Sequence, residues 1–313
     1  MPDQARREHT WAILTALFVT VLWSSSWVLI RWGLDDEGLQ PLTFAGIRYL
    51  LASVLLAGLV LATPAGRGSL SAMSRAFWGR LILLGLVFVA VAQGAQFVAI
   101  DTQPAATSSL VLSLTPLLVA AASTFALAER PTNRQVAGAA LIVLGAVAYF
   151  SGDLGFTAVG LAAAIVGLVA NAAGALMGRA ANRDRALLPL VVTVVSMSAG
   201  AITLVIAGLT LEGWPALSGR AWLIILWLAI VNTAWAFTLW NRSLQLLSAT
   251  ESAAINNTML IQIGLLAWVF LDETPGALDI VGMLSVSIGV YLASRPRLEN
   301  KVPIEQVPDP CRG

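Results

Sequence analysis

The sequence predicts an all-α integral membrane protein with ten transmembrane helices, arranged as two inverted five-helix repeats around a central cavity. Three observations predict this fold class. The 313 residues are 58% hydrophobic and 11% charged, whereas a soluble domain carries about 25% charged residues. The apolar runs are close to the roughly 20 residues that a helix needs to cross about 30 Å of hydrocarbon. The second half repeats features of the first, and a repeat with an odd number of spans enters the membrane from the opposite side.

Each predicted span is a long, continuous apolar run. Helices are favoured over lipid-facing barrel strands, because such strands alternate over only about ten residues. The spans are 10–30, 41–62, 78–98, 104–127 and 134–151 in the first repeat (10–151), and 156–178, 187–208, 219–241, 248–271 and 276–294 in the second repeat (156–294). The turns near 99–104 and 242–248 are short and partly apolar, which leaves a count of eight or nine spans as the alternative.

The distribution of basic residues favours ten spans over the smaller counts. With both termini in the cytoplasm, fifteen of the eighteen Lys and Arg residues fall on the cytoplasmic side, as the positive-inside rule requires. Arg31 and Arg220 fall outside, and Arg48 lies within a span. Residues 1–9 and 295–313 are then cytoplasmic tails. The second tail, with its prolines and mixed charge, is predicted to be disordered.

An internal repeat is clearest after the fourth span of each half. At an offset of 144 residues the segments 127–145 and 271–289 share Leu127 and Leu271, Glu129 and Glu273, Pro131 and Pro275, Gly138 and Gly282, and Gly145 and Gly289. Earlier in each half the offset is 148, which pairs Pro41 with Pro189. The matching Glu-x-x-Pro turns favour a true repeat over chance recurrence of leucine, glycine and proline. We expect both glutamates to stabilise exposed N–H groups at the start of a helix.

Several function classes have no support in the sequence. Cys311 is the only cysteine and His9 the only histidine, so there is no Cys/His metal cluster, and no metal or cofactor is predicted. The sequence has no Gly-rich phosphate loop and no paired nucleophile and base, so no catalytic residue is predicted. The basic residues follow the topology, so nucleic acid is not an expected partner. The expected partners are the lipid bilayer and a small-molecule substrate, and the oligomeric state is left open.

Four strings resemble the drug/metabolite transporter superfamily: LWSSSWVLIRWGL in the first span, PLTFAGIRYLLA in the second, SSLVLSLTPLL in the fourth, and the ERPT turn that follows. Over roughly residues 10–295 the chain is similar to the EamA-type ten-helix exporters. Among these it resembles bacterial amino-acid exporters, including those for aromatic amino acids. The resemblance implies an inner (plasma) membrane protein whose cavity is surrounded by the first, third and fourth spans of each half. The second half departs from this pattern, because it lacks the serine run and has Asn171 where Trp23 would fall.

The first half supplies candidate cavity residues in its first and third spans. Trp23 and Trp27 are one helical turn apart and share a face, beside Ser24. Indoles can hold an apolar or aromatic substrate, and the alternative for both is a lipid-facing or interfacial position. Gln93 and Gln96 share a face of the third span and are expected to point inward. They serve either as hydrogen-bonding contacts between helices or as contacts to the substrate.

The fourth span carries hydroxyl groups and a proline. Ser109 and Ser113 are candidate cavity residues, although such hydroxyls often bond back to carbonyls of their own helix. Pro116 removes one hydrogen bond of the helix and is a candidate gating hinge. At the offset of 144, Asn257 is the counterpart of Ser113, which favours Asn257 as a cavity residue.

The second half adds further amides and a tryptophan. Asn232 and Trp235 are three residues apart and are predicted to share the cavity face. Asn171 is a further candidate cavity residue, and it lies in an alanine-rich helix, which lets neighbouring helices approach closely. Trp240 lies nearer the inner end of its span and is predicted to be an interfacial anchor.

Two charged residues are candidates for a charge-dependent role. Arg48 lies clearly inside a span, where an ionised side chain marks a possible functional site. It either binds a substrate carboxylate or ties helices together through carbonyls, and it is close enough to the outer end to snorkel. Glu251 lies near the cytoplasmic end of its span. It is the best single candidate for a proton-linked carboxylate, against the alternative of a solvated charge at a helix end.

These residues predict an alternating-access exporter of small amphipathic metabolites, in particular amino acids including aromatic ones. A cavity of indole, amide and hydroxyl groups suits a neutral or zwitterionic solute better than a phosphorylated one. Multidrug efflux is an alternative, although it predicts a membrane-embedded carboxylate that the first span lacks. A non-transport membrane scaffold or lipid-handling protein is a further alternative. The sequence favours neither proton coupling nor facilitated flux.

Overall fold

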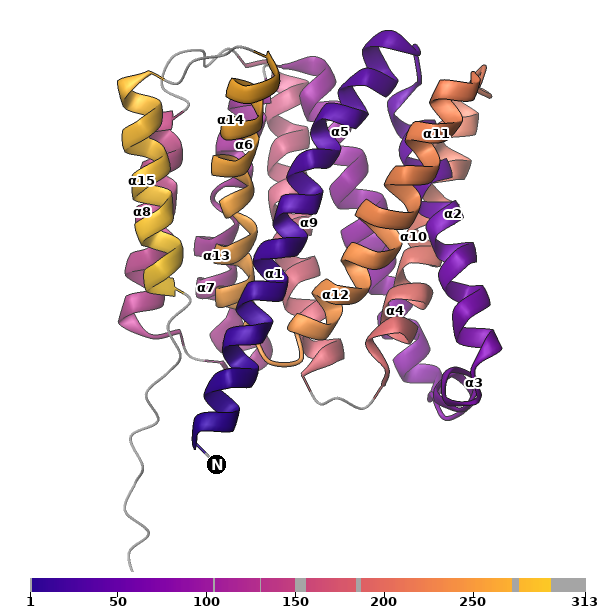
Figure 1. The fold of residues 1–313 in the computed structure, drawn as a ribbon, viewed down its shortest axis with the longest axis horizontal. Coiled ribbons are helices and arrows are strands. Elements are labelled where there is room, and N and C mark those ends of the chain that lie inside the picture. The colour runs from indigo at the N-terminus through magenta and orange to yellow at the C-terminus, as the bar shows by residue number, and fades with distance from the viewer. Residues whose placement is uncertain are drawn as a thin grey trace, which may run out of the picture.

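The protein, described by a computed structural model, is a bundle of helices that run side by side between two ends (Figure 1). The structure describes residues 2–103, 105–129, 131–149, 156–183, 187–271 and 276–293, and these contain helices and no strands. Within those ranges six helical runs are long and apolar enough to cross a membrane: Pro41–Ala62, Arg75–Gln96, Leu110–Leu127, Ala158–Asn182, Pro189–Leu211 and Gly219–Ser243. The helix Ala277–Ala293 is apolar but shorter. The all-α membrane class predicted from the sequence is thereby supported.

The helices of the first half fall where the apolar runs predict them. α1 (Pro2–Arg31) continues into the π-helical η1 (Trp32–Asp36), and α2 (Pro41–Ala62) and the short α3 (Pro64–Ser71) follow. α4 (Arg75–Gly85), the π-helical η2 (Leu86–Val91) and α5 (Ala92–Thr102) form one continuous run. The next run is divided into α6 (Ala105–Leu112) and α7 (Thr115–Leu127), and α8 (Asn133–Tyr149) completes the half. Because α1 begins at Pro2, residues 2–9 extend this helix, whereas the sequence predicts a cytoplasmic tail there.

The second half has the same succession of elements. It consists of α9 (Ala158–Asn182), α10 (Pro189–Leu211), the run of α11 (Gly219–Trp227), η3 (Leu228–Trp235) and α12 (Ala236–Ser243), the divided run of α13 (Ala249–Asn256) and α14 (Thr258–Leu271), and α15 (Ala277–Ala293). The predicted disordered tail at 295–313 lies outside the described residues, and so does Glu273.

Helix boundaries recur between the halves. α6 and α13 begin and end 144 residues apart, as do α8 and α15, and α4 and α11 begin at that same offset. The side chains that define these helix starts also recur. Ser74 and Ser218 cap the starts of α4 and α11 by accepting hydrogen bonds from the N–H groups of Phe77 (3.2 Å) and Ala221 (3.0 Å). Both third runs contain a π-helical segment, η2 and η3, and both fourth runs are interrupted in their middle.

α8 and α15 form an antiparallel pair at the left of Figure 1, and glycines make its closest contacts. A Cβ atom on Gly138 would lie 2.4 Å from the carbonyl oxygen of Gly289, and one on Gly145 would lie 2.7 Å from that of Gly282. At the repeat offset Gly138 corresponds to Gly282 and Gly145 to Gly289. The contact between Gly138 and Gly289 therefore has the same pair of repeat positions as the contact between Gly145 and Gly282, with the two helices exchanged. Such reciprocal contacts are typical of two units related by a two-fold axis.

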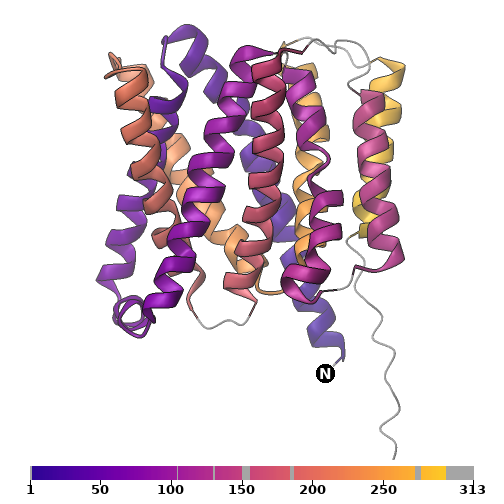
Figure 2. The same ribbon diagram turned by 180° about the vertical axis from the view of Figure 1, so that it is seen from behind.

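The first helix of each half packs against the other half. α1 contacts η3, α12, α13 and α14, and it crosses these elements in Figure 1. α9 makes the corresponding contacts with η2, α5, α6 and α7, beside which it stands in the rear view (Figure 2). Among the apolar core clusters, one is built around α2, η2 and α10 and another around α1, α12, α13 and α15. Trp23 packs against both clusters, so it lies where the two halves meet.

Candidate functional site

An aromatic cluster lies at this meeting point, with Phe237 of α12 at its centre. The ring of Phe237 lies 5.0 Å from Trp23 of α1, 6.0 Å from Tyr49 of α2 and 6.4 Å from Phe88 of η2, measured between ring centroids. Trp240 lies 5.1 Å from Trp23 on the other side. Tilted and edge-on pairs of this kind stabilise packing beyond the apolar area that they bury. Four elements from both halves therefore contribute to one cluster, which we call the aromatic cluster.

A polar contact joins this cluster to η3. The indole N–H of Trp23 donates to the carbonyl oxygen of Asn232 at 3.1 Å, and the amide of Asn232 donates to the Leu22 carbonyl oxygen and to Ser25 Oγ. Asn232 is fully buried, and its Oδ1 has no hydrogen-bond partner within the described residues. A buried acceptor without a partner is costly. The segment is π-helical, a geometry that is frequent at functional sites because it interrupts the regular hydrogen-bond ladder.

Arg48 lies directly beside this contact. Its Nε donates to Thr233 Oγ1 at 3.1 Å and its Nη2 to the Tyr49 hydroxyl at 3.4 Å, while its guanidinium lies 4.8 Å from the Tyr49 ring centroid. The residue is 7% exposed. Among the described residues no carboxylate lies within 4.0 Å of it, and Nη1 makes no hydrogen bond. A buried cation without a counter-ion is a strongly unfavourable state, so the site is suited to an anionic ligand group.

Ser24 belongs to a separate, self-satisfied polar cluster. Its hydroxyl donates to Gln262 Oε1 at 2.8 Å, and Gln262 Nε2 donates to Thr20 and Thr258 at 3.0 and 3.1 Å. Thr20 and Thr258 also contact each other at 3.1 Å. Both polar ends of the glutamine are occupied, so these residues tie α1 to α14. The structure thus gives Ser24 a bond between helices, where the sequence analysis predicts a cavity position.

Ser113 and Asn257 lie at the breaks in the two divided runs. Ser113 Oγ bonds back to Leu110 O at 2.6 Å, and Asn257 Nδ2 bonds back to Ala253 O at 3.0 Å. Pro116 lies in the first turn of α7, directly after the first break. The proline therefore starts a helix instead of kinking a continuous one, which is the position it tolerates best.

Three predicted amides remain half-buried. Asn171 donates to the carbonyl oxygen of Gly167 within its own helix at 2.9 Å. Gln93 and Gln96 in α5 make no hydrogen bond to any described residue. The side chains of Gln93 and Gln96 are therefore available to water or to a ligand.

The structure places Trp235 away from the aromatic cluster. Its side chain is 50% exposed, and its ring packs edge-on against Phe18, which is 44% exposed. In a π-helical segment the angular step per residue differs from that of an α-helix, so Asn232 and Trp235 do not share a face as their spacing predicts. The side chains of Trp27 and Ser109 lie outside the described residues.

Glu251 has a structural role at the end of the bundle that carries the N-terminus. It forms a capping box with Ser248 at the start of α13, and its Oε1 lies 3.2 Å from His9 Nε2. Nearby, Glu129 accepts from Arg179 Nε at 2.8 Å and from the Ala249 N–H at 3.3 Å. Glu129 thus stabilises the N-terminus of α13 in the other half, and not that of the helix that follows it in sequence. These contacts fasten α1, α7, α9 and α13 together.

Sequence reasoning missed most of the aromatic cluster. Tyr49, Phe88 and Phe237 were not among the candidate residues, and Trp240, predicted to be an interfacial anchor, is 8% exposed and packs on Trp23. The prediction for Trp240 is therefore wrong. One signal was available, because Thr233, Phe237 and Trp240 follow one another at spacings of four and three residues and so lie along one helical face.

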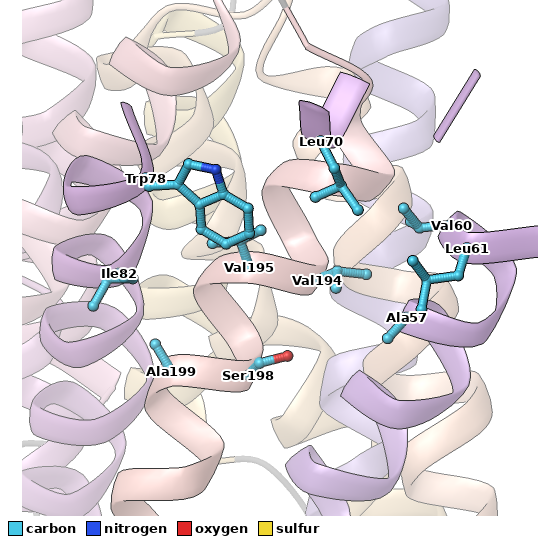
Figure 3. A pocket seen from close by; sticks show the side chains of 10 residues that line it. All are labelled: Ala57, Val60, Leu61, Leu70, Trp78, Ile82, Val194, Val195, Ser198 and Ala199. Atoms are coloured by element: carbon cyan, nitrogen blue, oxygen red, sulfur yellow. The ribbon is translucent and has the colours of Figure 1, made fainter. Parts of the chain in front are cut away.

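A hollow of about 290 Å³ lies elsewhere, between α2, α3, α4 and α10 (Figure 3). Its wall includes Val60, Leu70, Trp78 and Val195, and none of the predicted site residues lines it. Arg48 and the cluster residues Tyr49, Phe237 and Trp240 are, by contrast, buried. Within the described residues no group of three or more His, Cys, Asp or Glu residues could hold a metal ion.

Comparison with known proteins identifies relatives across nearly the whole chain. The model of the EamA-like transporter family matches residues 10–151 and again residues 158–295. A probable terminal-alkyne amino-acid exporter of Streptantibioticus cattleyicolor is 28% identical over 294 residues, which cover 92% of this chain and 94% of that protein. A probable amino-acid metabolite efflux pump of Salmonella typhimurium is 25% identical over 293 residues, 88% of this chain and 92% of that protein.

The fold is also found among solved structures. One crystal structure superposes with a TM-score of 0.75 at 22% sequence identity and covers 91% of this chain and 96% of its own. At this identity the similarity concerns the fold alone.

Proposed function

The chain belongs to the EamA-like transporter family, whose members are membrane transporters of small molecules, and on that premise we propose that it exports amino acids, aromatic ones among them, by alternating access. Two relatives are named as amino-acid exporters or efflux pumps. The observation that carries the proposal is Arg48, a buried cation without a carboxylate partner among the described residues, next to the aromatic cluster. Such a site offers a positive charge and an apolar aromatic surface to the same small amphipathic solute.

Each part of a bound amino acid can be assigned to particular residues of this site. The guanidinium of Arg48, whose Nη1 bonds to none of the described residues, binds the carboxylate through charge-assisted hydrogen bonds. The unpartnered Oδ1 of Asn232, one residue from the Thr233 that holds Arg48, accepts from the α-ammonium group. The rings of Trp23 and Phe237 receive an apolar or aromatic side chain.

The proposed architecture is ten crossings in two inverted repeats, 10–151 and 156–294, in the bacterial inner membrane with both termini in the cytoplasm. Its support is the recurrence of helix boundaries at an offset of 144, the reciprocal glycine contacts of α8 and α15, and the separate match of one family model to each half. α8 and α15 have 17 residues each, at the lower end of the range of about 17–25 that spans a bilayer. In an inverted repeat the substrate binds at the interface of the halves, which is where Trp23 lies.

The proposal is tested by transport. Proteoliposomes loaded with a panel of labelled amino acids, including tryptophan and threonine, are expected to release aromatic amino acids faster than protein-free liposomes. The Phe237→Leu substitution removes the central ring and is expected to slow aromatic release by up to about tenfold, because an aromatic pair contributes about 0.5–1.5 kcal/mol. Trp235→Leu, which changes a half-exposed ring of the same run, is the matched control and is expected to leave release within about twofold.

The competing functions predict other results in that assay. If no amino acid moves while a lipophilic cation does, the protein is a multidrug exporter and the amino-acid proposal is wrong. If neither class of solute moves, while labelled lipid is transferred, the protein handles lipids.

A further inference from the structure

The hollow shown in Figure 3 is an apolar groove on the side of the bundle, distinct from the aromatic cluster. Val60 and Leu61 of α2, Leu70 of α3, Trp78 and Ile82 of α4, and Val195 of α10 line it. Its volume is about 290 Å³, at the lower limit of ligand pockets, which begin near 300 Å³. Since the chain is a membrane transporter, this lateral groove faces lipid, and it has room for a slender apolar group such as an acyl chain.

Two basic residues, Arg67 and Arg75, lie close in the chain to residues that line the groove. Arg67 lies one turn before Leu70 in α3, and its Nη1 donates to the carbonyl oxygen of Leu61 at 2.5 Å, which holds the guanidinium beside a residue that lines the groove. Arg75 lies one turn before Trp78 on the same face of α4. Both arginines are exposed, and neither has a carboxylate partner among the described residues.

The surrounding sequence has no compensating negative charge. Between Gly38 and Ile100 the chain contains four arginines and no Asp or Glu, and the part of the second half that lines the groove, α10, contains none either. An exposed Trp78 completes the arrangement, since indoles favour the boundary between headgroups and hydrocarbon. Positive charge beside the groove and the apolar wall of the groove together complement an amphiphile with an anionic head.

We propose that this groove is a binding site for an anionic phospholipid, with one acyl chain lying along α2, α4 and α10 and the phosphate held by Arg67 and Arg75. Basic residues beside a membrane helix attract anionic headgroups, and the adjoining apolar groove adds selectivity for a molecule that also has a tail. The site lies at the end of the bundle where α3 and the N-terminus are found (Figure 1). It is separate from the site proposed for transport, so the bound lipid is a stabilising ligand and not the transported substrate.

Native mass spectrometry of the delipidated, detergent-purified full chain tests this proposal. Phosphatidylglycerol is expected to be retained more strongly than phosphatidylcholine with the same acyl chains. The double variant Arg67→Gln/Arg75→Gln is expected to lose this preference, by about fivefold for each arginine. Arg80→Gln is the matched control, because Arg80 carries the same charge on α4 but points away from the face of Trp78. It is expected to keep most of the preference.

A second variant tests the groove itself. Ala199→Leu places a larger side chain in the wall of the groove without changing any charge, and it is expected to weaken retention of both lipids. Equal retention of the two lipids by the unsubstituted protein would overturn the proposal. An equal loss of the preference for phosphatidylglycerol in Arg80→Gln and in the double variant would also overturn it, because it would indicate unspecific electrostatic attraction of the anionic lipid. Displacement of the lipid by inorganic phosphate alone would show a phosphate site without a role for the acyl chain, and would also overturn it.

Discussion

Replacing Arg48 with glutamine is expected to reduce the release of amino acids from loaded proteoliposomes by about 30-fold or more. Removing one partner of a buried, hydrogen-bonded charge pair costs about 2–5 kcal/mol, and each 1.4 kcal/mol is a factor of ten. The introduced glutamine would keep a donor toward Thr233, to which Arg48 Nε is bonded, so the bond between α2 and η3 is largely preserved. The change therefore removes the charge while leaving the packing.

The specificity of this variant separates a substrate contact from a structural one. If Arg48 binds the carboxylate, the unsubstituted protein discriminates against tryptamine, which lacks that group, and Arg48→Gln loses the discrimination. Arg220→Gln is the matched control, since Arg220 is 57% exposed at its side chain and pairs with Asp36 outside the site. If Arg48→Gln has an unchanged melting temperature and transports tryptophan at the unsubstituted rate, Arg48 does not bind the substrate.

The Gly85→Ala substitution is expected to lower the apparent melting temperature more than a Gly→Ala substitution at any other described glycine. A Cβ atom on Gly85 would lie 1.8 Å from the carbonyl oxygen of Ser196 in α10, closer than any real contact, so α4 and α10 would have to separate. Overpacking of this kind costs about 1–3 kcal/mol or more. Thermal unfolding in detergent, followed by loss of monodisperse protein, measures the effect.

Gly79→Ala on the same helix is the control for this substitution. A Cβ atom there would meet nothing within 4 Å, and alanine favours a helix over glycine by about 1 kcal/mol. This variant is expected to be at least as stable as the unsubstituted protein. Equal melting temperatures for the two variants would show that α4 and α10 do not pack as closely as the structure has them.

The sequence predicted the positions of the helices well, because the signals are local. Hydropathy sets the apolar runs, and residues such as Pro41, Pro189 and Ser74 define helix starts through backbone chemistry that acts within one turn. The π-helical segments η2 and η3 left no such signal. Each of them contacts the first helix of the other half, η3 with α1 and η2 with α9, and such tertiary contacts cannot be read from hydropathy.

The candidate site was predicted less completely for the same reason. Trp23, Asn232 and Arg48 could be predicted because they are polar or aromatic residues in apolar helices. They do lie close together, since Trp23 bonds to Asn232 and Arg48 bonds to the neighbouring Thr233. Phe237 and Tyr49 carry no unusual chemistry for a membrane helix, so only the rotation of each helix reveals that they complete the cluster. That rotation is set by close contacts between helices, which hydropathy does not encode.

The orientation of the two halves can be measured directly with the alanines at 72 and 216, which are both exposed and lie at the repeat offset of 144. Each is replaced by cysteine in a background where Cys311, the only native cysteine, is changed to serine. Inverted repeats predict that a membrane-impermeant thiol reagent added to intact cells labels Ala216→Cys alone, and that in inside-out vesicles it labels Ala72→Cys alone. Labelling of both cysteines from the same side would contradict the antiparallel arrangement, and with it the shared site between the halves.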